Sequence, residues 1–282
     1  MNIVDHVKLL GYLCRPETIF LRRSSRALGD NLLLTVVARD VRRRFPDRPL
    51  VVETPFPEIF LHNPHVTFAT AAHWKTTRRH LKPKYFLSAD SYETHIADQL
   101  LAQIRGGKGV SGVDPALRRP RIHFSAAEAE CWATFEPEEA VVICPVGKQS
   151  HSADRKEWGV ERFQEVVRGM PGVRFVQIGG RLDPLLKGVV DRRGLSIRES
   201  AGVLSAGRLF TGLEGGLMHL AAAVGRPAVI VYGGAVHPGS TGYPEHVALA
   251  RRPECSPCVT SHERMAPCPN ALQCLTSIQP VD

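Results

Sequence analysis

Short apolar runs alternate with helix-forming stretches along the whole chain, and this alternation limits the fold more than any other feature of the sequence. In the first half, residues 18–23 (TIFLRR) have the pattern of a strand and residues 49–54 (PLVVET) that of the next one. Between them, residues 31–45 are typical of a helix with Leu33 and Val37 on its apolar face. A strand, helix, strand order is typical of parallel sheets covered by helices, so we predict an α/β protein.

The second half of the chain repeats this order. Residues 139–147 and 173–180 are predicted strands on either side of a helix at residues 159–170. Residues 207–234 then supply a strand, a helix that Gly225 ends, and a further strand. The two halves therefore have the same kind of architecture.

A Gly-, Pro- and Arg-rich stretch, residues 105–121, is typical of a connection between domains, and an amphipathic helix is predicted before it at residues 89–104. We predict one domain over residues 1–135 and a second over residues 136–282. Open parallel sheets bind ligands at the carboxyl ends of their strands, where this chain has several polar or glycine-rich segments. A cleft between the domains is the expected binding site.

The composition is that of an ordinary globular protein, with 43% apolar and 23% charged residues among 282. No apolar run approaches the roughly 18 residues that cross a bilayer, and Asp5, His6 and Lys8 interrupt the apolar opening. We therefore expect a cytoplasmic protein without a secretory signal. A formal net charge of +8 favours anionic partners such as nucleotides, phosphorylated glycans, nucleic acid or an acidic membrane face.

Two adjacent glycines mark the clearest candidate site. Gly215 and Gly216 lie where the predicted strand at Phe210 passes into the helix that contains His219. Glycine lets the backbone approach a ligand closely, and the first amides of a helix have no partner within the helix. The sequence therefore predicts an anion site here, with phosphate as the expected guest.

Five segments resemble, in this order, the motifs of glycosyltransferase family 9, which includes the ADP-heptose heptosyltransferases of lipopolysaccharide assembly. They are SRALGDNLLLT (25–35), RKEWGVERF (155–163), QIGGRLD (177–183), GLEGGLMHLAAAVGRPAVIVYGG (212–234) and a cysteine-rich tail (255–274). The resemblance implies a GT-B fold, in which two Rossmann-like domains with parallel sheets face a central cleft. It also implies a cytoplasmic, metal-independent, inverting transferase with the acceptor on the first domain and the nucleotide sugar on the second.

By this resemblance Asp30 is the catalytic base, which takes the proton of the acceptor hydroxyl. The alternative is that Asp30 only caps the helix that follows it, and both roles are compatible. Lys156 is expected to contact the donor phosphates, because a leaving diphosphate without a metal needs fixed positive charge. The alternatives are that Lys156 is merely solvated or that Arg155 replaces it, and Ser150 and Ser152 are further candidate donors to the phosphates.

The remaining donor contacts follow from the same resemblance. Asp183 is a candidate for the ribose hydroxyls, and its alternative role is to close a plain turn. His219 is expected near the donor, and its alternative role is helix packing. The predicted substrate-binding residues of the second domain are Lys156, Gly179, Gly180, Asp183, Glu214, Gly215, Gly216, Leu217, His219, Thr241 and Gly242. Glu214 stands where the family usually has Asp. The loop at residues 231–243 also departs from the family pattern, although Pro238, Thr241 and Gly242 match its second half.

Four cysteines, Cys255, Cys258, Cys268 and Cys274, gather in the tail at a spacing that suits a tetrahedral zinc or iron site. Such a metal would be structural, because four thiolates leave no open coordination position. The alternative is reduced cysteines that pack a small lobe. The other three, Cys14, Cys131 and Cys144, have apolar neighbours typical of buried thiols.

The sequence thus predicts a glycosyltransferase that moves a sugar, with heptose favoured, from a nucleoside diphosphate (ADP-heptose favoured) to a glycan or lipid-linked acceptor. Peripheral contact with an anionic inner membrane is compatible with the charge. A catalytically inactive nucleotide-sugar-binding or scaffold protein of the same fold is the alternative, suggested by Glu214 and by a tail that stops soon after Cys274. A nucleic-acid-binding protein is disfavoured, because the arginines are scattered and aromatic residues make up only 7%.

Overall fold

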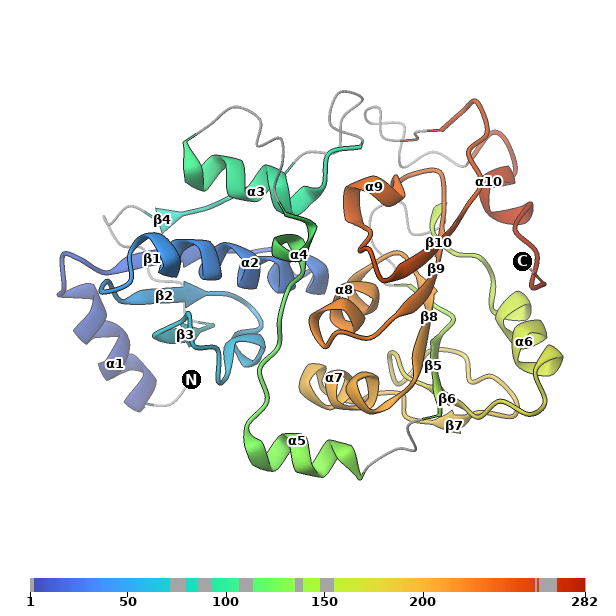
Figure 1. Cartoon of the computed structure of the whole chain (residues 1–282), viewed down its shortest axis with the longest axis horizontal. Helices are drawn as coiled ribbons and strands as arrows, with labels where there is room; N and C mark the ends of the chain where they lie inside the picture. The colour runs from blue at the N-terminus through green and yellow to red at the C-terminus, as the bar shows by residue number, and fades with distance from the viewer. Residues whose placement is uncertain are drawn as a thin grey trace.

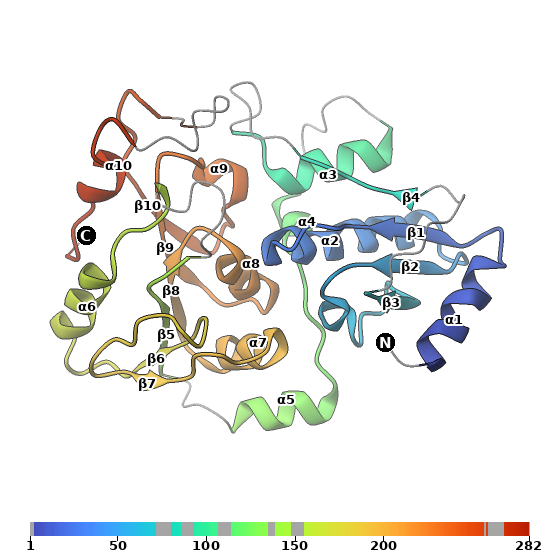
Figure 2. The same ribbon diagram turned by 180° about the vertical axis from the view of Figure 1, so that it is seen from behind.

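The computed structural model describes residues 3–71, 80–85, 93–106, 114–134, 139–147, 155–256, 258 and 268–281. The chain forms two lobes side by side, each built on a parallel sheet with helices against it (Figures 1 and 2). The predicted two-domain α/β architecture of the GT-B type is therefore confirmed.

The first lobe contains a four-stranded parallel sheet in the order β3-β2-β1-β4. Its strands are β1 (Ile19–Arg22), β2 (Leu50–Glu53), β3 (Phe68–Thr70) and β4 (His80–Leu81). Its helices are α1 (Ile3–Leu13), α2 (Leu28–Arg44), the 3₁₀ helix η1 (Pro57–Phe60) and α3 (Ile96–Arg105). Leu9 of α1 packs on Phe20 and Val51 of the sheet, whereas the buried side of α2 joins the main core.

The second lobe contains a six-stranded parallel sheet in the order β10-β9-β8-β5-β6-β7. Its strands are β5 (Val141–Cys144), β6 (Phe175–Gln177), β7 (Val190–Asp191), β8 (Leu209–Leu213), β9 (Ala228–Tyr232) and β10 (His246–Ala250). Helices α7 (Ile197–Ala206), α8 (Gly216–Ala223) and α9 (Pro238–Thr241) lie on the side that faces the first lobe, and α6 (Val160–Gly169) and α10 (Gln273–Thr276) lie on the far side (Figure 1).

Both sheets have a point where the strand order changes direction. In the second sheet the chain starts at the central strand β5, builds β6 and β7 on one side, and returns to add β8 on the other. In the first sheet β1 is flanked by β2 on one side and β4 on the other. The loops that leave β1, β5 and β8 therefore open at the crevices where such sheets bind ligands.

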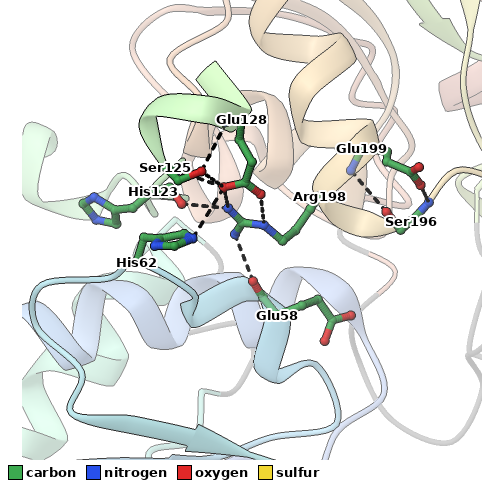
Figure 3. Close-up of polar contacts among 8 residues, drawn as sticks. All are labelled: Glu58, His62, His123, Ser125, Glu128, Ser196, Arg198 and Glu199. Carbon is green, nitrogen blue, oxygen red and sulfur yellow. Dashed lines mark hydrogen bonds and ion pairs between the residues drawn. The ribbon is translucent and has the colours of Figure 1, made fainter. Parts of the chain in front are cut away.

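The connection between the lobes contains α4 (Pro115–Arg118) and α5 (Ala126–Ala133), and Arg198 of α7 ties it to both lobes (Figure 3). Arg198 donates to the Glu128 carboxylate through Nε and Nη2, at 2.8 Å each. It also donates to the carbonyl oxygens of His123 at 2.9 Å and of Glu58 in η1 at 3.0 Å. One buried guanidinium thus joins the second lobe, the connection and the first lobe.

Several elements differ from the sequence predictions. Helix α2 begins at Leu28 rather than Asn31, so Asp30 lies inside its first turn and Ala27 is the N-cap residue. The predicted helix at residues 89–104 is observed from Ile96, and residues 86–92 lie outside the described residues. Cys144 is buried as predicted, whereas Cys14 and Cys131 are exposed, because their apolar neighbours do not place them in the core. No helix in the described ranges combines the length and the hydropathy that a membrane span needs.

Candidate active site

A cleft of about 730 Å³ lies between the lobes and brings together most of the predicted site residues. The predicted residues that line it are Asp30, Lys156, Gly179, Gly180, Asp183, Glu214, Gly215, Gly216, Leu217 and His219. They come from the loops after β1, β5, β6 and β8 and from the first turns of α2 and α8. Parallel strands explain this convergence, because their carboxyl ends meet at one edge of each sheet.

The first wall of the cleft carries Asp30, whose carboxylate is held from two sides. Tyr85 donates its hydroxyl to Oδ1 at 2.6 Å, and Arg23 Nη2 lies 2.7 Å from Oδ2. The Arg23 guanidinium also stacks over the Tyr85 ring at 5.5 Å and donates to the Pro83 carbonyl oxygen at 2.9 Å. Asp30 therefore does not act as the N-cap of α2, the alternative role considered from the sequence.

These contacts set the protonation of Asp30. Burial raises its pKa, but hydrogen bonds from Ser25, Tyr85 and Arg23 outweigh burial and leave the pKa below its ordinary value. Burial and the nearby Asp30 charge raise the pKa of Tyr85, so this hydroxyl stays protonated and remains a donor. Asp30 is thus an ionised carboxylate with a weak affinity for protons.

The opposite wall is the first turn of α8. Gly215 precedes the helix with φ 156° and ψ −157°, a backbone region that is essentially restricted to glycine, so the chain can turn sharply out of β8. Gly215, Gly216 and Leu217 line the cleft, and the first amides of a helix have no partner within the helix, as an anion site requires.

The two walls approach each other closely. A Cβ atom on Gly29 would lie 2.5 Å from Cδ2 and 3.2 Å from Nε2 of His219, so only glycine allows this contact between α2 and α8. His219 is 4% exposed, and burial lowers its pKa to about 4. The ring is therefore neutral at pH 7.

Lys156 forms an ion pair with Glu214, and both line the cleft. The Glu214 side chain is 6% exposed and that of Lys156 is 29% exposed. A buried carboxylate needs a partner of opposite charge, which Lys156 supplies. The Glu214 carboxylate thus neutralises part of the positive charge that Lys156 is expected to offer to the phosphates of the donor. Arg155 is buried, and it does not line the cleft.

A third part of the cleft lies beyond β6. Asp183 accepts from the Gly180 amide at 2.6 Å and closes the turn, as one alternative predicted. It also lines the cleft with Gly179 and Gly180, as the ribose-binding hypothesis requires. Both roles are compatible with this geometry.

Thr241 and Gly242 do not line the cleft. Thr241 is 3% exposed and its hydroxyl lies 3.5 Å from that of Tyr232, whereas the Gly242 carbonyl oxygen lies 3.1 Å from His95 Nε2. Their direct contact with a donor stays a prediction. Ser150 and Ser152 lie outside the described residues.

The tail cysteines do not support the predicted structural metal. Among the described residues no group of three or more His, Cys, Asp or Glu side chains is arranged to hold a metal ion. Cys255 is exposed, Cys258 and Cys268 are half-buried, and Cys274 is buried. Burial and the neighbouring cysteines raise the pKa of Cys258, which favours the protonated thiol.

Three residues of the site were missed at the sequence level. Arg23 is the last residue of a predicted strand, and its closeness in sequence to the LGD motif could have indicated that it lies in the site. Tyr85 had no signal, because it is 55 residues from Asp30 in the chain. Glu157 lines the cleft and accepts from the Gly147 amide at 2.8 Å, and burial raises its pKa.

Comparisons with known proteins show what the sequence and the fold of this chain resemble. The model of glycosyltransferase family 9 (heptosyltransferase) matches residues 194–268, which include α7, β8, α8 and β9. No curated protein matches the chain significantly.

Three solved structures show the extent of the structural likeness. A family 9 glycosyltransferase from Veillonella parvula DSM 2008 has a TM-score of 0.69 at 15% identity, with 94% of each chain covered. TibC, the iron-containing dodecameric glycosyltransferase of enterotoxigenic E. coli H10407, has a TM-score of 0.68 at 19% identity, with 94% of this chain and 74% of TibC covered. The E. coli heptosyltransferase WaaC, solved with ADP, has a TM-score of 0.57 at 18% identity, with 86% and 96% covered.

The fold and the cleft thus define the class of the protein as a two-lobed α/β protein with the fold of GT-B glycosyltransferases. Within that class, the predicted resemblance to glycosyltransferase family 9 is confirmed. Residues 194–268 resemble the heptosyltransferase family in sequence, and most of the chain resembles the solved family 9 structures in fold.

Proposed function

We propose that this protein is an inverting glycosyltransferase that moves a sugar, with heptose favoured, from a nucleoside diphosphate to a glycan or lipid-linked acceptor. The observation that carries the proposal is the meeting of Asp30 and the first turn of α8 across one cleft. The acceptor is assigned to the lobe within residues 1–135 and the nucleotide sugar to the lobe within residues 136–282. ADP-heptose is the favoured donor, because TibC has been solved with ADP-D-β-D-heptose and WaaC with ADP.

In the proposed reaction Asp30 accepts the proton of the acceptor hydroxyl while that oxygen bonds to the anomeric carbon. The bond from the anomeric carbon to the phosphate oxygen breaks on the opposite face of the sugar. Lys156 and the amides of residues 215–217 stabilise the negative charge of the departing diphosphate. Because Asp30 is a weak base, proton transfer must come late, when the acceptor oxygen has already become acidic.

A non-catalytic nucleotide-sugar-binding protein is the second candidate, and two observations favour it. Both oxygens of Asp30 are engaged by donors, and Lys156 is paired with Glu214. A site with these two restraints can bind a nucleotide and still transfer a sugar slowly or not at all.

Two experiments separate these candidates. Thermal stabilisation by ADP, GDP, UDP and CMP tests the nucleotide site, because a ligand that binds only the folded form raises the Tm. Turnover by Asp30→Asn then tests the base, and we expect the rate to fall by about 10²- to 10⁴-fold with little change in ADP binding. A measurable wild-type rate that Asp30→Asn leaves untouched contradicts the assignment of Asp30, and ADP binding without turnover supports the second candidate.

A further inference from the structure

His219 is joined to a buried tyrosine behind the cleft. Its Nδ1 lies 2.6 Å from the Tyr243 hydroxyl oxygen, and the two rings meet edge to face at 5.7 Å. Tyr243 is 5% exposed and lies two residues after Thr241, the last residue of α9. No motif in the sequence pointed to a role for Tyr243.

The direction of this hydrogen bond follows from the hydrogen-bonding capacity of the two groups. Within the described part of the chain, His219 Nδ1 is the one acceptor in reach of the Tyr243 hydroxyl. Burial raises the pKa of Tyr243 well above its ordinary value, so the hydroxyl keeps its proton. If Nδ1 carried the imidazole proton instead, the tyrosine proton would be buried without an acceptor, which is costly. Tyr243 therefore donates, and Nδ1 accepts.

A neutral imidazole that accepts at Nδ1 carries its proton on Nε2. In His219, Nε2 belongs to the ring edge that packs on Gly29, next to Asp30. We propose that Tyr243 is a positioning residue that keeps the His219 proton on Nε2, so that a neutral N–H is presented to an oxygen of the bound sugar diphosphate. The proposed tautomer follows from the contact between His219 and Tyr243, whereas its use toward a sugar diphosphate rests on the proposed function.

The backbone next to Tyr243 is held from the other lobe. His95, the N-cap residue of α3, accepts from the Ala97 amide at Nδ1 over 3.1 Å, and its Nε2 lies 3.1 Å from the Gly242 carbonyl oxygen. Burial lowers the pKa of His95 to about 3, so the ring is neutral and its Nε2–H donates to Gly242. The His95 ring also meets Tyr243 edge-on at 5.7 Å. The first lobe thus fixes the loop that carries Tyr243.

The tautomer is measurable without any substrate. Long-range ¹H–¹⁵N correlation spectra of the ¹⁵N-labelled protein distinguish the protonated from the unprotonated ring nitrogen of each of the 12 histidines. His219→Gln assigns the His219 signals by their loss. We expect a protonated Nε2 and an unprotonated, hydrogen-bonded Nδ1 in the wild type. A proton on Nδ1 overturns the inference, whether or not the protein transfers sugars.

Variants test the use of this proton. Tyr243→Phe removes the donor to Nδ1, and we expect an altered His219 Nδ1 signal and a kcat about tenfold lower or more, with the KM for the donor changed less. Tyr232→Phe is the matched control, because it removes another buried hydroxyl, one that is bound to Met218 Sδ at 3.1 Å rather than to His219. We expect wild-type His219 signals and near wild-type kcat for this control.

A second pair of variants examines the two ring positions separately. The amide nitrogen of Gln reaches the position of Nε2, whereas that of Asn reaches the position of Nδ1. We therefore expect His219→Gln to keep several-fold more transferase activity than His219→Asn. Equal activities of this pair, or Tyr243→Phe with wild-type kcat, overturn the assigned use of the proton. Lack of transfer by every form contradicts the proposed function but leaves the spectroscopic result standing.

Discussion

Asp30 is the residue on which the proposed chemistry depends, and its neighbours decide how it can act. Two donors hold its carboxylate in place and lower its pKa against the effect of burial. The same contacts that orient it make it a weaker base. The contacts therefore orient the Asp30 carboxylate at the expense of its proton affinity. This suits a reaction in which the proton leaves the acceptor hydroxyl late, after the bond to the sugar has begun to form.

Tyr85→Phe tests this balance. The change removes one of the hydrogen bonds that lower the pKa of Asp30, so that pKa rises. A base must be deprotonated to act, and we therefore expect the acidic limb of the pH profile of kcat/KM to move to higher pH. Tyr12→Phe, a change in a tyrosine that packs on Phe68 away from the cleft, is the control and is expected to leave the limb in place. A limb that stays or moves to lower pH in Tyr85→Phe contradicts this account.

The pair of Lys156 and Glu214 leads to a second prediction at the residue scale. Glu214→Gln removes a negative charge beside the proposed diphosphate site and releases Lys156. We expect ADP to bind about fivefold tighter, which corresponds to about 1 kcal/mol. Isothermal titration calorimetry measures this directly, with Glu165→Gln on the exposed side of α6 as the control. Unchanged or weaker binding by Glu214→Gln means that Glu214 does not restrain Lys156.

At the scale of elements, the cleft depends on how closely the first turns of α2 and α8 approach. The contact between Gly29 and His219 brings a carboxylate at the start of one helix opposite the free amides of the other. A side chain at position 29 would separate the two helices. Gly29 thus allows α2 and α8 to pack closely, and this packing places the two proposed reactive parts of the site on either side of one cleft.

Gly29→Ala tests this contact. The added methyl would lie 2.5 Å from His219 Cδ2, so the ring or a helix must shift. We expect the free energy of unfolding to fall by about 1–3 kcal/mol, as for other overpacked sites, with a lower Tm in thermal unfolding. Gly169→Ala at the end of α6 has open space around it and is expected to leave the Tm nearly unchanged. Equal Tm values for both variants would show that α2 and α8 can separate without cost.

At the scale of the whole molecule, the relative position of the lobes is held beside the cleft by Arg198 (Figure 3). Leu195, Ile197 and Ser200 line the cleft from the start of α7, the helix that carries Arg198. Arg198 donates to groups of the connection and of η1. Helix α7 therefore contributes both to the wall of the cleft and to the junction of the lobes.

The pH dependence of stability provides a test of this junction. The pKa of Glu128 is lowered from 4.5 to about 2, and the hydrogen bond from Arg198 is the largest cause. Because the pKa of Glu128 is lower in the folded than in the unfolded chain, ionised Glu128 stabilises the fold at pH values above about 4.5. This stabilisation is lost as the pH falls from about 4.5 towards 2. We expect Arg198→Met to lower the free energy of unfolding by about 1–3 kcal/mol at pH 7.

The difference between wild type and Arg198→Met should shrink as the pH falls below about 4.5, because protonated Glu128 no longer attracts the guanidinium. Urea unfolding at several pH values measures it. Arg193→Met, which removes a pair with the 42% exposed Asp191 away from the connection, is the control and is expected to cost less. A difference that stays constant down to pH 3 contradicts the role assigned to Glu128.

The amino-acid sequence by itself determined the alternation of strands and helices, the two-lobed α/β class, the helix after Gly215 and ten of the residues that line the cleft. These features depend on local patterns: apolar periodicity, glycine at strand-to-helix turns, and parallel strands whose carboxyl ends meet. Gly225 is one example, since it follows α8 with φ 73°, as a helix stop requires.

Only the tertiary structure decided which side chains meet across the chain. Tyr85 and Arg23 on Asp30, Tyr243 on His219 and Glu214 on Lys156 join residues that are far apart in sequence or on different elements. It also decided that Thr241 and Gly242 do not line the cleft and that the tail cysteines form no metal site within the described residues. Such contacts depend on packing between elements and on burial, and neither is encoded in a local pattern.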